Sequence, residues 1–231
     1  MRAIDVMATA VVVARPDMTV RDVAGMLADY RISGMPVVDA QGNLVGVITE
    51  GDLLRRAEIG TEGKRRAWWL DLIASTRGLA SEYVKEHSRL VSEVMTTNVV
   101  TVAEETPLSE IAELMERHRI KRIPVMRDGR MTGLVSRANL IRALASVGPK
   151  LRGSITPDDS AIREAILSAM SASRWALQRD NVIVTNGVVH LWGMITSEDE
   201  GKAIRVAAEN VPGVKEVKSH LEFPTIPPLL N

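Results

Sequence analysis

The sequence predicts an α+β protein in which two copies of a β-α-β-β-α unit are followed by a smaller α-β-β-α-β domain. Three observations support this class. A stretch of about fifty residues recurs after about 88 residues. Within it, short Val- and Ile-rich runs alternate with apolar stripes of helical period. After Gly148-Pro149 a different pattern begins. Because one unit is too small to bury both faces of its sheet, we expect the copies to pack as a pseudo-symmetric pair.

These features divide the 231 residues into six segments. We expect the first repeat at residues 1–57, a helical connector at 58–90, the second repeat at 91–147, a linker at 148–154, the C-terminal domain at 155–223 and a tail at 224–231. The repeat is clearest where Asp5-Val6-Met7 returns as Glu93-Val94-Met95, and where Pro36-Val37 returns as Pro124-Val125.

Each unit is predicted to open with a strand and an amphipathic helix. Val11–Val13 is the first strand, and Thr19 with Asp22 has the spacing of a capping box. In the second unit Thr106-Pro107 starts the helix, with Pro107 at the first helical position, where its missing N–H costs nothing. The buried helix faces are expected to be Val20, Val23, Ala24 and Leu27, and Leu108, Ile111, Ala112 and Met115.

A hairpin is predicted next. In the first unit Met35–Val38 and Leu44–Ile48 are its strands, joined by the turn Gln41-Gly42-Asn43. Arg127-Asp128-Gly129 takes the place of that turn in the second unit. A second helix then follows in both copies.

The stretch from Gly46 to Asp52 joins the hairpin to this helix, and it returns from Gly133 to Asn139. Both copies read Gly, two apolar residues, a hydroxyl residue, two variable residues, and Asp or Asn. The unpaired N–H groups at a helix start attract anions, so the hydroxyl residue suits a phosphate and the Asp or Asn a sugar. The same spacing also forms a helix cap. One arrangement can serve both purposes, as a cap when empty and a clamp when filled.

The connector contains two features whose roles stay open. Lys64-Arg65-Arg66 is either a solvated helix end or a patch for a phosphate or acidic partner. The pair Trp68-Trp69 either anchors a dimer or packs onto its own module.

The C-terminal domain is predicted from a helix beginning at Thr156 and a hairpin around Asn186-Gly187. Asn-Gly between two β-prone runs is a strong hairpin signal. A second helix begins at Ser197, and Val217–Phe223 forms the last strand.

Composition limits the function. Lys plus Arg and Asp plus Glu both number 29, so no basic excess favours nucleic acid. There is no Cys, which excludes disulfides and thiolate metal sites and permits the cytoplasmic location that we expect. We expect neither a signal peptide nor a membrane span. The four His residues are scattered, and no nucleophile or P-loop motif is found, so we expect no metal site and no enzyme.

The two repeats resemble CBS domains, and a tandem pair resembles the Bateman module. The resemblance rests on Asp5-Val6-Met7, on the Pro-Val-Val strand, and on the repeated Gly-x-x-[Thr/Ser]-x-x-[Asp/Asn] motif. It implies a regulatory adenosine ligand: AMP, ADP, ATP, or a related compound such as NAD or S-adenosylmethionine. Paired CBS modules commonly dimerise, so a homodimer is expected. CBS pairs also occur inside inosine monophosphate dehydrogenase, but we expect no catalytic barrel in this chain.

The resemblance also assigns ligand contacts. Asp52 and Asn139 would hold ribose, while Thr49 and Ser136 would contact phosphate. Arg137 is a further phosphate candidate, whereas its counterpart Glu50 disfavours a polyphosphate. The implied adenine slots, whose residues could equally be core, are Val13, Ile32 and Val47 in the first unit and Thr101, Ile120 and Leu134 in the second. Since Asn139 offers one neutral acceptor oxygen, we expect two non-equivalent sites, the first better suited to ribose and the second to phosphate.

The C-terminal domain resembles a BON domain through Asn186–Val189, Trp192-Gly193 and Val211–Val214. That family is implicated in membrane-surface binding. However, residues 155–223 contain 7 Lys and Arg against 10 Asp and Glu, which does not favour anionic lipid.

Three functions therefore stay open. The first is a nucleotide sensor that signals to the BON domain or a partner. The second is a non-catalytic dimeric scaffold in which the repeated motifs are only helix caps. The third is a membrane-surface protein that acts through the BON domain.

Overall fold

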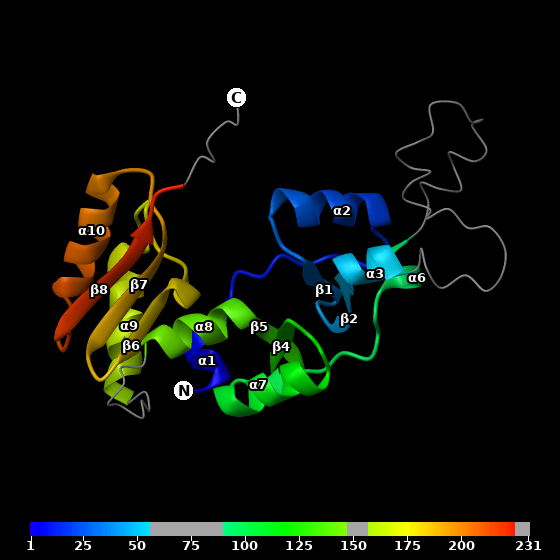
Figure 1. Ribbon diagram of the computed structural model, residues 1–231, viewed down its shortest axis with the longest axis horizontal. Coiled ribbons are helices and arrows are strands. Elements are labelled where there is room, and N and C mark those ends of the chain that lie inside the picture. Colours follow the sequence, from blue (N-terminus) through cyan, green and yellow to red (C-terminus); the bar gives the residue numbers. More distant parts are fainter. Residues whose placement is uncertain (56–89, 147–156, 225–231) are drawn as a thin grey trace. The chain divides into compact units, whose positions relative to one another are not determined.

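The computed structural model describes residues 1–55, 90–146 and 157–224 (Figure 1). The predicted connector helices, with Lys64–Arg66 and Trp68-Trp69, lie outside the described residues. So do the predicted linker and all but the first residue of the predicted tail. The predicted α+β class is confirmed, because helices and small sheets alternate along the chain.

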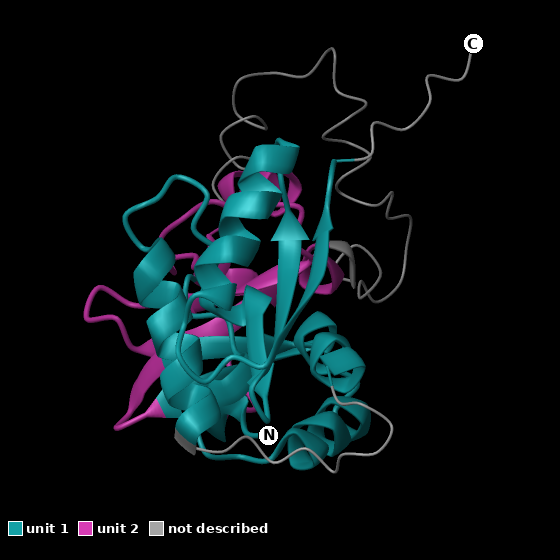
Figure 2. Cartoon of the chain, turned by 90° about the vertical axis from the view of Figure 1, so that its left-hand side faces the viewer, with its two compact units in different colours: residues 1–10, 102–126, 132–231 teal, residues 11–101, 127–131 magenta. Residues whose placement is uncertain are grey.

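Two compact units cut across the repeat boundaries (Figure 2). Unit 1 contains residues 1–10, 102–126 and 132–231, and unit 2 contains residues 11–101 and 127–131. The segment that opens the first repeat therefore folds with the second repeat, and the segment that opens the second repeat folds with the first.

Unit 2 is built around the first hairpin. Its elements are α2 (Val20–Asp29), β1 (Gly34–Val38), β2 (Leu44–Thr49), α3 (Glu50–Arg55) and α6 (Val91–Val94). Strands β1 and β2 pair antiparallel. The core holds Ala14, Val20, Val23, Leu27, Met35, Val37, Ile48, Val91 and Val94.

The predicted cap of α2 is present. Asp22 N donates to Thr19 Oγ1 at 3.1 Å, and Thr19 N donates to Asp22 Oδ2 at 3.3 Å. Of the predicted buried stripe, Val20, Val23 and Leu27 are buried, whereas Ala24 is exposed. The helical period was therefore right, and one edge of the stripe faces solvent.

The strand predicted at Val11–Val13 is not formed. Only Ala14 bridges β1, donating to Pro36 O and accepting from Val38 N, both at 2.9 Å. A parallel ladder that continued back to Val12 would need an N–H from Pro36, which has none. Pro124 imposes the same limit in the second repeat, where β3 is only Val102–Ala103.

The first part of unit 1 is most of the second repeat, from Val102 onward, together with the N-terminal segment. It contains α1 (Ala3–Val6), β3, α7 (Leu108–Arg117), β4 (Arg122–Arg127), β5 (Arg130–Ser136) and α8 (Arg137–Ser146), with sheet order β3-β4-β5. Its core holds Ala3, Val6, Met7, Val102, Ile111, Met115, Ile123, Val125, Val135 and Ala143. Pro107 is the N-cap of α7, one position before the predicted one, and Leu108 N donates to Met1 O at 3.2 Å.

The exchange of opening segments is fixed by matched contacts. Thr96 pairs with Val47 in unit 2, and Ala8 pairs with Leu134 in unit 1. A Cβ atom at Gly46 would lie 2.7 Å from Met95 Sδ, and one at Gly133 would lie 2.7 Å from Met7 Sδ. These two glycines are therefore needed because a methionine from the other repeat's opening segment packs directly against the strand.

The C-terminal part of unit 1 has two helices on one face of a three-stranded sheet. Its elements are α9 (Pro157–Met170), η1 (Arg179–Asn181), β6 (Val182–Thr185), β7 (Val188–Met194), α10 (Glu198–Glu209) and β8 (Glu216–Glu222). The predicted turn is confirmed, since Asn186 and Gly187 both have positive φ, at 53° and 79°. Strands β7 and β8 pair parallel, with α10 as the crossover.

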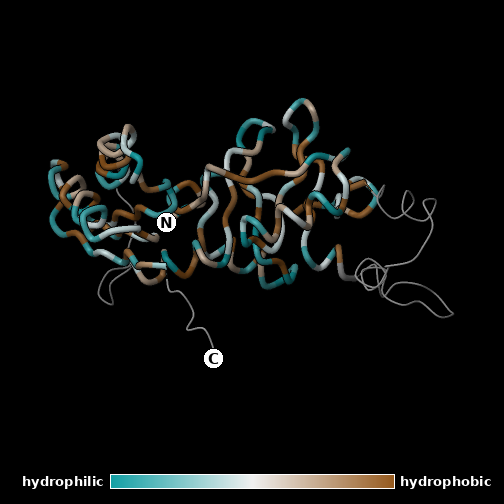
Figure 3. The backbone as a smooth tube through the Cα atoms, turned by 90° about the horizontal axis from the view of Figure 1, so that it is seen from above, coloured by the Kyte–Doolittle hydropathy of each residue, from teal (hydrophilic) through white to brown (hydrophobic). Residues whose placement is uncertain are grey.

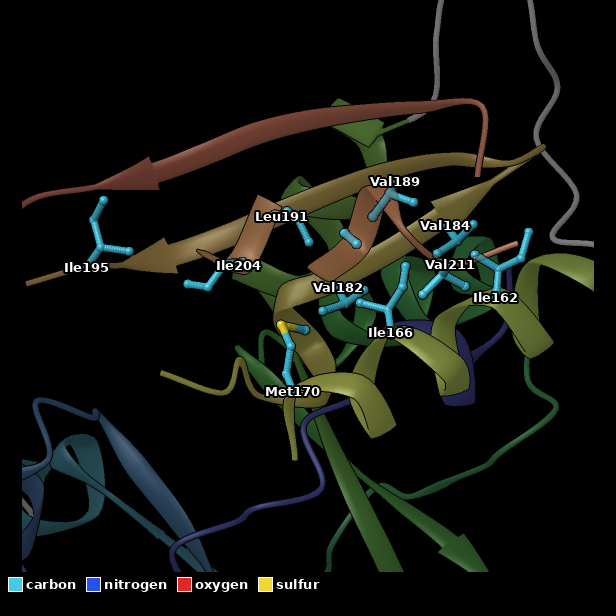
Figure 4. Close-up of a cluster of buried hydrophobic side chains, with 11 residues drawn as sticks. Ile162, Ile166, Met170, Val182, Val184, Val189, Leu191, Ile195, Ile204 and Val211 are labelled. Carbon is cyan, nitrogen blue, oxygen red and sulfur yellow. The ribbon is translucent and has the colours of Figure 1, made fainter. Parts of the chain in front are cut away.

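The core of this domain is formed by α9 and α10 against β6 and β7 (Figure 4). Ile162, Ile166 and Met170 project from α9 toward the strands, where Val182 and Leu191 meet them. The domain therefore has an apolar core of its own.

Among the described residues, no helix is both long and apolar enough to cross a membrane. Hydropathy changes over short distances along the chain (Figure 3).

Candidate functional site

The first candidate site lies where β2 passes into α3. Thr49 Oγ1 donates to Asp52 Oδ2 at 2.7 Å, and Thr49 N donates to the same oxygen at 2.9 Å. Asp52 N lies 3.3 Å from Thr49 Oγ1. The predicted hydroxyl and carboxylate are thus adjacent, and they form a closed capping box.

The other carboxylate oxygen of Asp52 meets a residue that the sequence did not predict. Thr96 Oγ1 donates to Asp52 Oδ1 at 3.1 Å. Thr96 belongs to the opening segment of the second repeat, so its role depends on the segment exchange. The repeat alignment held the relevant signal, because Thr96 aligns with Ala8 and only one copy has a hydroxyl there.

The second candidate site repeats this geometry between β5 and α8. Ser136 Oγ donates to Asn139 Oδ1 at 2.6 Å, and Ser136 N donates to it at 2.8 Å. Asn139 N lies 3.4 Å from Ser136 Oγ. The amide oxygen of Asn139 therefore replaces the inner carboxylate oxygen of Asp52, and its amide nitrogen replaces the outer one.

That amide nitrogen contacts the C-terminal domain. Asn139 Nδ2 donates to Asp180 Oδ2 in η1 at 3.3 Å. Arg142, one turn further along α8, donates from Nη1 to Asn181 Oδ1 at 2.8 Å and lies 3.5 Å from Asp180 Oδ2. Asn139 is only 4% exposed, whereas Asp52 is half-buried. The two candidate sites differ in their surroundings as well as in their residues.

The residue that follows Thr49 or Ser136 forms a backbone hydrogen bond to the residue just before the neighbouring strand. Glu50 N donates to Ser33 O at 3.2 Å, and Arg137 N donates to Lys121 O at 3.1 Å. These bonds place each helix start beside the segment that follows Ile32 or Ile120. The Arg137 side chain is exposed.

Five of the six predicted adenine-slot residues are half-buried: Val13, Ile32, Val47, Ile120 and Leu134. Ile32 and Ile120 pack at the edges of the two repeat cores. Thr101 is exposed, and it belongs to unit 2, whereas Ile120 and Leu134 belong to unit 1.

Both repeats hold an arginine in the left-handed backbone region, immediately before Ile32 and Ile120. Arg31 has φ 52° and Arg119 has φ 54°. Each follows a helix and completes a Schellman motif, in which Ile32 N donates to Leu27 O at 3.0 Å and Ile120 N donates to Met115 O at 2.9 Å. Glycine is the usual residue at this position. Because a strained backbone carries an arginine at the same place in both repeats, Arg31 and Arg119 are further candidates for function.

Family models place CBS domains at residues 3–58 and 91–146 and a BON domain at residues 158–225. The chain is a CBS domain pair followed by a BON domain. The resemblance inferred from the sequence is thereby confirmed, and the hairpin-to-helix motif lies inside each CBS domain.

Several curated proteins are similar to the CBS pair. The chloroplastic CBS domain-containing protein CBSX1 of Arabidopsis thaliana is 29% identical over 140 residues, which are 58% of this chain and 59% of that protein. The chain thus matches about three fifths of the length of that relative. Inosine-5'-monophosphate dehydrogenase of Mycobacterium leprae is 33% identical over 138 residues, but these are only 21% of the enzyme. The matches to that enzyme lie only in its CBS domains.

Two solved structures are similar over the same region. CBSX2 in complex with AMP has 26% identity and a TM-score of 0.48, covering 62% of this chain and 96% of that one. The CBS domain of a CBS domain-containing membrane protein from Sphaerobacter thermophilus has 34% identity and a TM-score of 0.46, covering 62% and 86%.

Across residues 1–55, 90–146 and 157–224, no group of three or more His, Asp or Glu side chains is placed to hold a metal ion. The groups present at the two CBS motifs are hydrogen-bond donors and acceptors at helix starts.

Proposed function

We propose that the CBS pair is a ligand-sensing regulatory module for an adenosine-containing nucleotide. The observation that carries this proposal is the repeated junction of strand and helix, with Thr49 beside Asp52 and Ser136 beside Asn139. A helix start with a hydroxyl and an acceptor one turn on offers partners for both phosphate and ribose. The family assignment favours an adenosine ligand over other phosphorylated sugars.

Asp52 is proposed to hold the ribose of the first ligand. Its Oδ2 is committed to the cap of α3, but Oδ1 accepts only one bond in the described residues, from Thr96. A carboxylate oxygen has two lone pairs, so Oδ1 retains capacity for a ribose hydroxyl. A hydrogen bond to a charged group contributes roughly 1.5–3 kcal/mol. Thr49 would then meet phosphate, and the half-buried Val13, Ile32 and Val47 would border the adenine.

Asn139 is proposed to hold ribose at the second site less strongly. Its Oδ1 is used by Ser136, and its outer atom is an N–H donor. Ser136 and the exposed Arg137 are proposed for phosphate, with the half-buried Ile120 and Leu134 as the apolar borders of the base. The first site therefore favours ribose, and the second favours phosphate.

The competing interpretation is a scaffold in which both motifs only cap helices. The closed capping boxes favour it, since every bond between Thr49 and Asp52 would also be expected of a cap. The two interpretations predict different effects of one substitution. Asp52→Ala removes the side-chain acceptor of the capping box and costs about 1 kcal/mol of stability in either case. Only nucleotide binding also predicts a loss of affinity.

A calorimetric panel tests the proposal. AMP, ADP, ATP, NAD and S-adenosylmethionine are titrated into full-length protein freed of nucleotide, and then into Asp52→Ala. We expect at least one of these ligands to bind and the variant to bind it at least tenfold more weakly, which corresponds to about 1.4 kcal/mol. Asp52→Asn is the matched control, because it keeps the cap acceptor and should fall between the two. Absence of binding at millimolar ligand would contradict the proposal.

We also propose a homodimer formed through the CBS pair. Ile141 and Leu144 lie three residues apart on α8 and are 66% and 75% exposed. Two large apolar side chains on one exposed helix face are suited to a second copy of the chain. Light scattering of the full chain should give twice the monomer mass, and Ile141→Glu with Leu144→Glu should give the monomer.

A further inference from the structure

We propose that the BON domain occupies the ribose end of the second CBS site, so that BON docking and nucleotide binding there exclude each other. This proposal rests on the proposed function of the CBS pair and concerns how nucleotide binding at the second site is regulated. The supporting contact is between Asn139 of the second site and Asp180 of the BON domain.

The contact to the BON domain is made by the side chain of Asn139, the residue proposed to hold ribose. Asn139 Nδ2 is the atom that corresponds to the ligand-facing oxygen of Asp52, and it donates to Asp180 Oδ2 at 3.3 Å. Arg142 holds the same turn by donating to Asn181 Oδ1 at 2.8 Å. With the carboxylate of Asp180 in this place, Asn139 is 4% exposed. A ribose hydroxyl at Asn139 Nδ2 would have to replace Asp180.

A second anchor fixes the BON domain to the same unit. Arg163 on α9 is 4% exposed and donates from Nη1 to Ile4 O of α1 at 3.2 Å. Its Nη2 donates to Arg179 O of η1 at 2.6 Å. Burial lowers the pKa of Arg163 to about 10, which still leaves it charged at neutral pH. Arg163 therefore ties the turn that carries Asp180 to the N-terminal segment that packs with the second repeat.

The first site lacks this arrangement. Its outer oxygen accepts from Thr96 of the exchanged segment, and the residue equivalent to Thr96 at the second site is Ala8, which has no hydroxyl. The BON domain supplies the missing partner. The Asp180 carboxylate would also repel a nucleotide phosphate placed near Asn139, since like charges in a partly buried setting oppose each other.

This arrangement makes the two sites unequal in occupancy. With the BON domain docked, the chain binds one nucleotide, at Asp52. If the docked state is favoured by roughly 100 to 1, affinity at the second site is reduced by about the same factor. By linkage, a nucleotide that does bind there releases the BON domain by that factor. As the nucleotide concentration rises, a larger fraction of molecules therefore has the BON domain released and the surface of η1 exposed.

Calorimetry with AMP on the full chain tests the inference. Wild type should bind one AMP, and Asp180→Ala should bind two or tighten its second site at least tenfold. The double variant Asp52→Ala/Asp180→Ala should still bind one AMP, whereas Asp52→Ala alone should bind AMP at least tenfold more weakly than wild type. Asp199→Ala is the matched control, an acidic residue of the same domain whose side chain is 94% exposed; it should behave as wild type.

Hydrogen exchange supplies a readout that does not depend on AMP. The amides of η1 and β6 should lose protection in Asp180→Ala, and in wild type only at AMP concentrations that fill the second site. Two equal sites in wild type, or an unchanged binding profile in Asp180→Ala, would overturn this inference and leave the proposed function standing. Absence of binding of AMP, ADP, ATP, NAD and S-adenosylmethionine in every variant would overturn both.

Discussion

The hydroxyl of Thr96 donates to the carboxylate of Asp52 at 3.1 Å, although 44 residues separate them in the sequence. The first candidate site therefore includes a residue from the segment that opens the second repeat. The second motif has a different partner. Ala8, which aligns with Thr96, has no hydroxyl, and Asn139 donates instead to Asp180 of the BON domain. The same hairpin-to-helix motif therefore occurs twice in the chain with different hydrogen-bond partners.

Removal of the Thr96 hydroxyl should weaken the first site without unfolding the chain. Thr96→Val should cost about 0.5–1 kcal/mol of stability, because a mostly exposed hydrogen bond is lost. It should also lower affinity for the first ligand several-fold, since Asp52 loses the partner that orients Oδ1. Denaturant titration and calorimetry measure the two effects. Thr97→Val, at the exposed neighbouring position, should change neither; equal effects at both positions would show that the Thr96 contact is unimportant.

Methyl groups added at the two strand glycines that contact the exchanged segments should destabilise the fold. Gly46→Ala and Gly133→Ala each place a Cβ atom 2.7 Å from a methionine sulfur, so each should cost about 1–3 kcal/mol. Gly25→Ala is the control, because nothing lies within 4 Å of its Cβ position in α2, and it should gain about 0.5–1 kcal/mol. Met95→Ala should restore part of the loss in Gly46→Ala. A neutral Gly46→Ala would argue against the exchange.

Substitution of the two arginines with left-handed backbone should affect stability and ligand affinity in opposite directions. Arg31→Gly and Arg119→Gly remove the side chain and relieve a strained backbone, so each should raise the free energy of unfolding by up to about 1 kcal/mol. If these side chains serve the ligand, affinity for AMP should fall several-fold in the same variants. Thermal unfolding and calorimetry check the two effects together. A gain in stability with unchanged affinity would assign the arginines no role in binding.

The BON domain should lose stability in weak acid because of His190. Burial is the main cause that lowers the pKa of His190 to about 4, and electrostatic repulsion from the nearby His220 and Lys218 lowers it further. In the unfolded chain His190 has an ordinary pKa near 6.5, so the unfolded state binds more protons as pH falls from about 6.5 to 4. Stability should decline across that window by up to about 3 kcal/mol.

The substitution His190→Gln should flatten this dependence, and His118→Gln, on the exposed end of α7, is its control. Denaturant unfolding at pH 7.0, 5.5 and 4.5 measures it. The same slope in His190→Gln and wild type would show that other groups cause the acid sensitivity.

Local patterns predicted local structure well. The Thr19 cap, the helix periods and the Asn186-Gly187 turn all depend on neighbours within a few residues, and all are present. The strand at Val11–Val13 was wrong because its partner would have needed an N–H from Pro36, a distant residue.

The contacts at the candidate sites that the sequence did not predict join residues far apart in the chain. An internal repeat does not reveal which copy's opening segment packs with which hairpin, so Thr96 was not assigned to Asp52. The pairing of Asn139 with Asp180 joins two different domains, and no pattern in either domain predicts it. The roles proposed for the site residues remain predictions, although the paired residues are adjacent in each motif.

The most direct test of the central claim is the number of AMP molecules bound per chain, measured by equilibrium dialysis of wild type and Asp52→Ala. We predict one AMP per chain in wild type at concentrations below those that release the BON domain, and an affinity for AMP at least tenfold weaker in Asp52→Ala. Equal binding by the two proteins would contradict it, because Asp52 would then be a helix cap and nothing more.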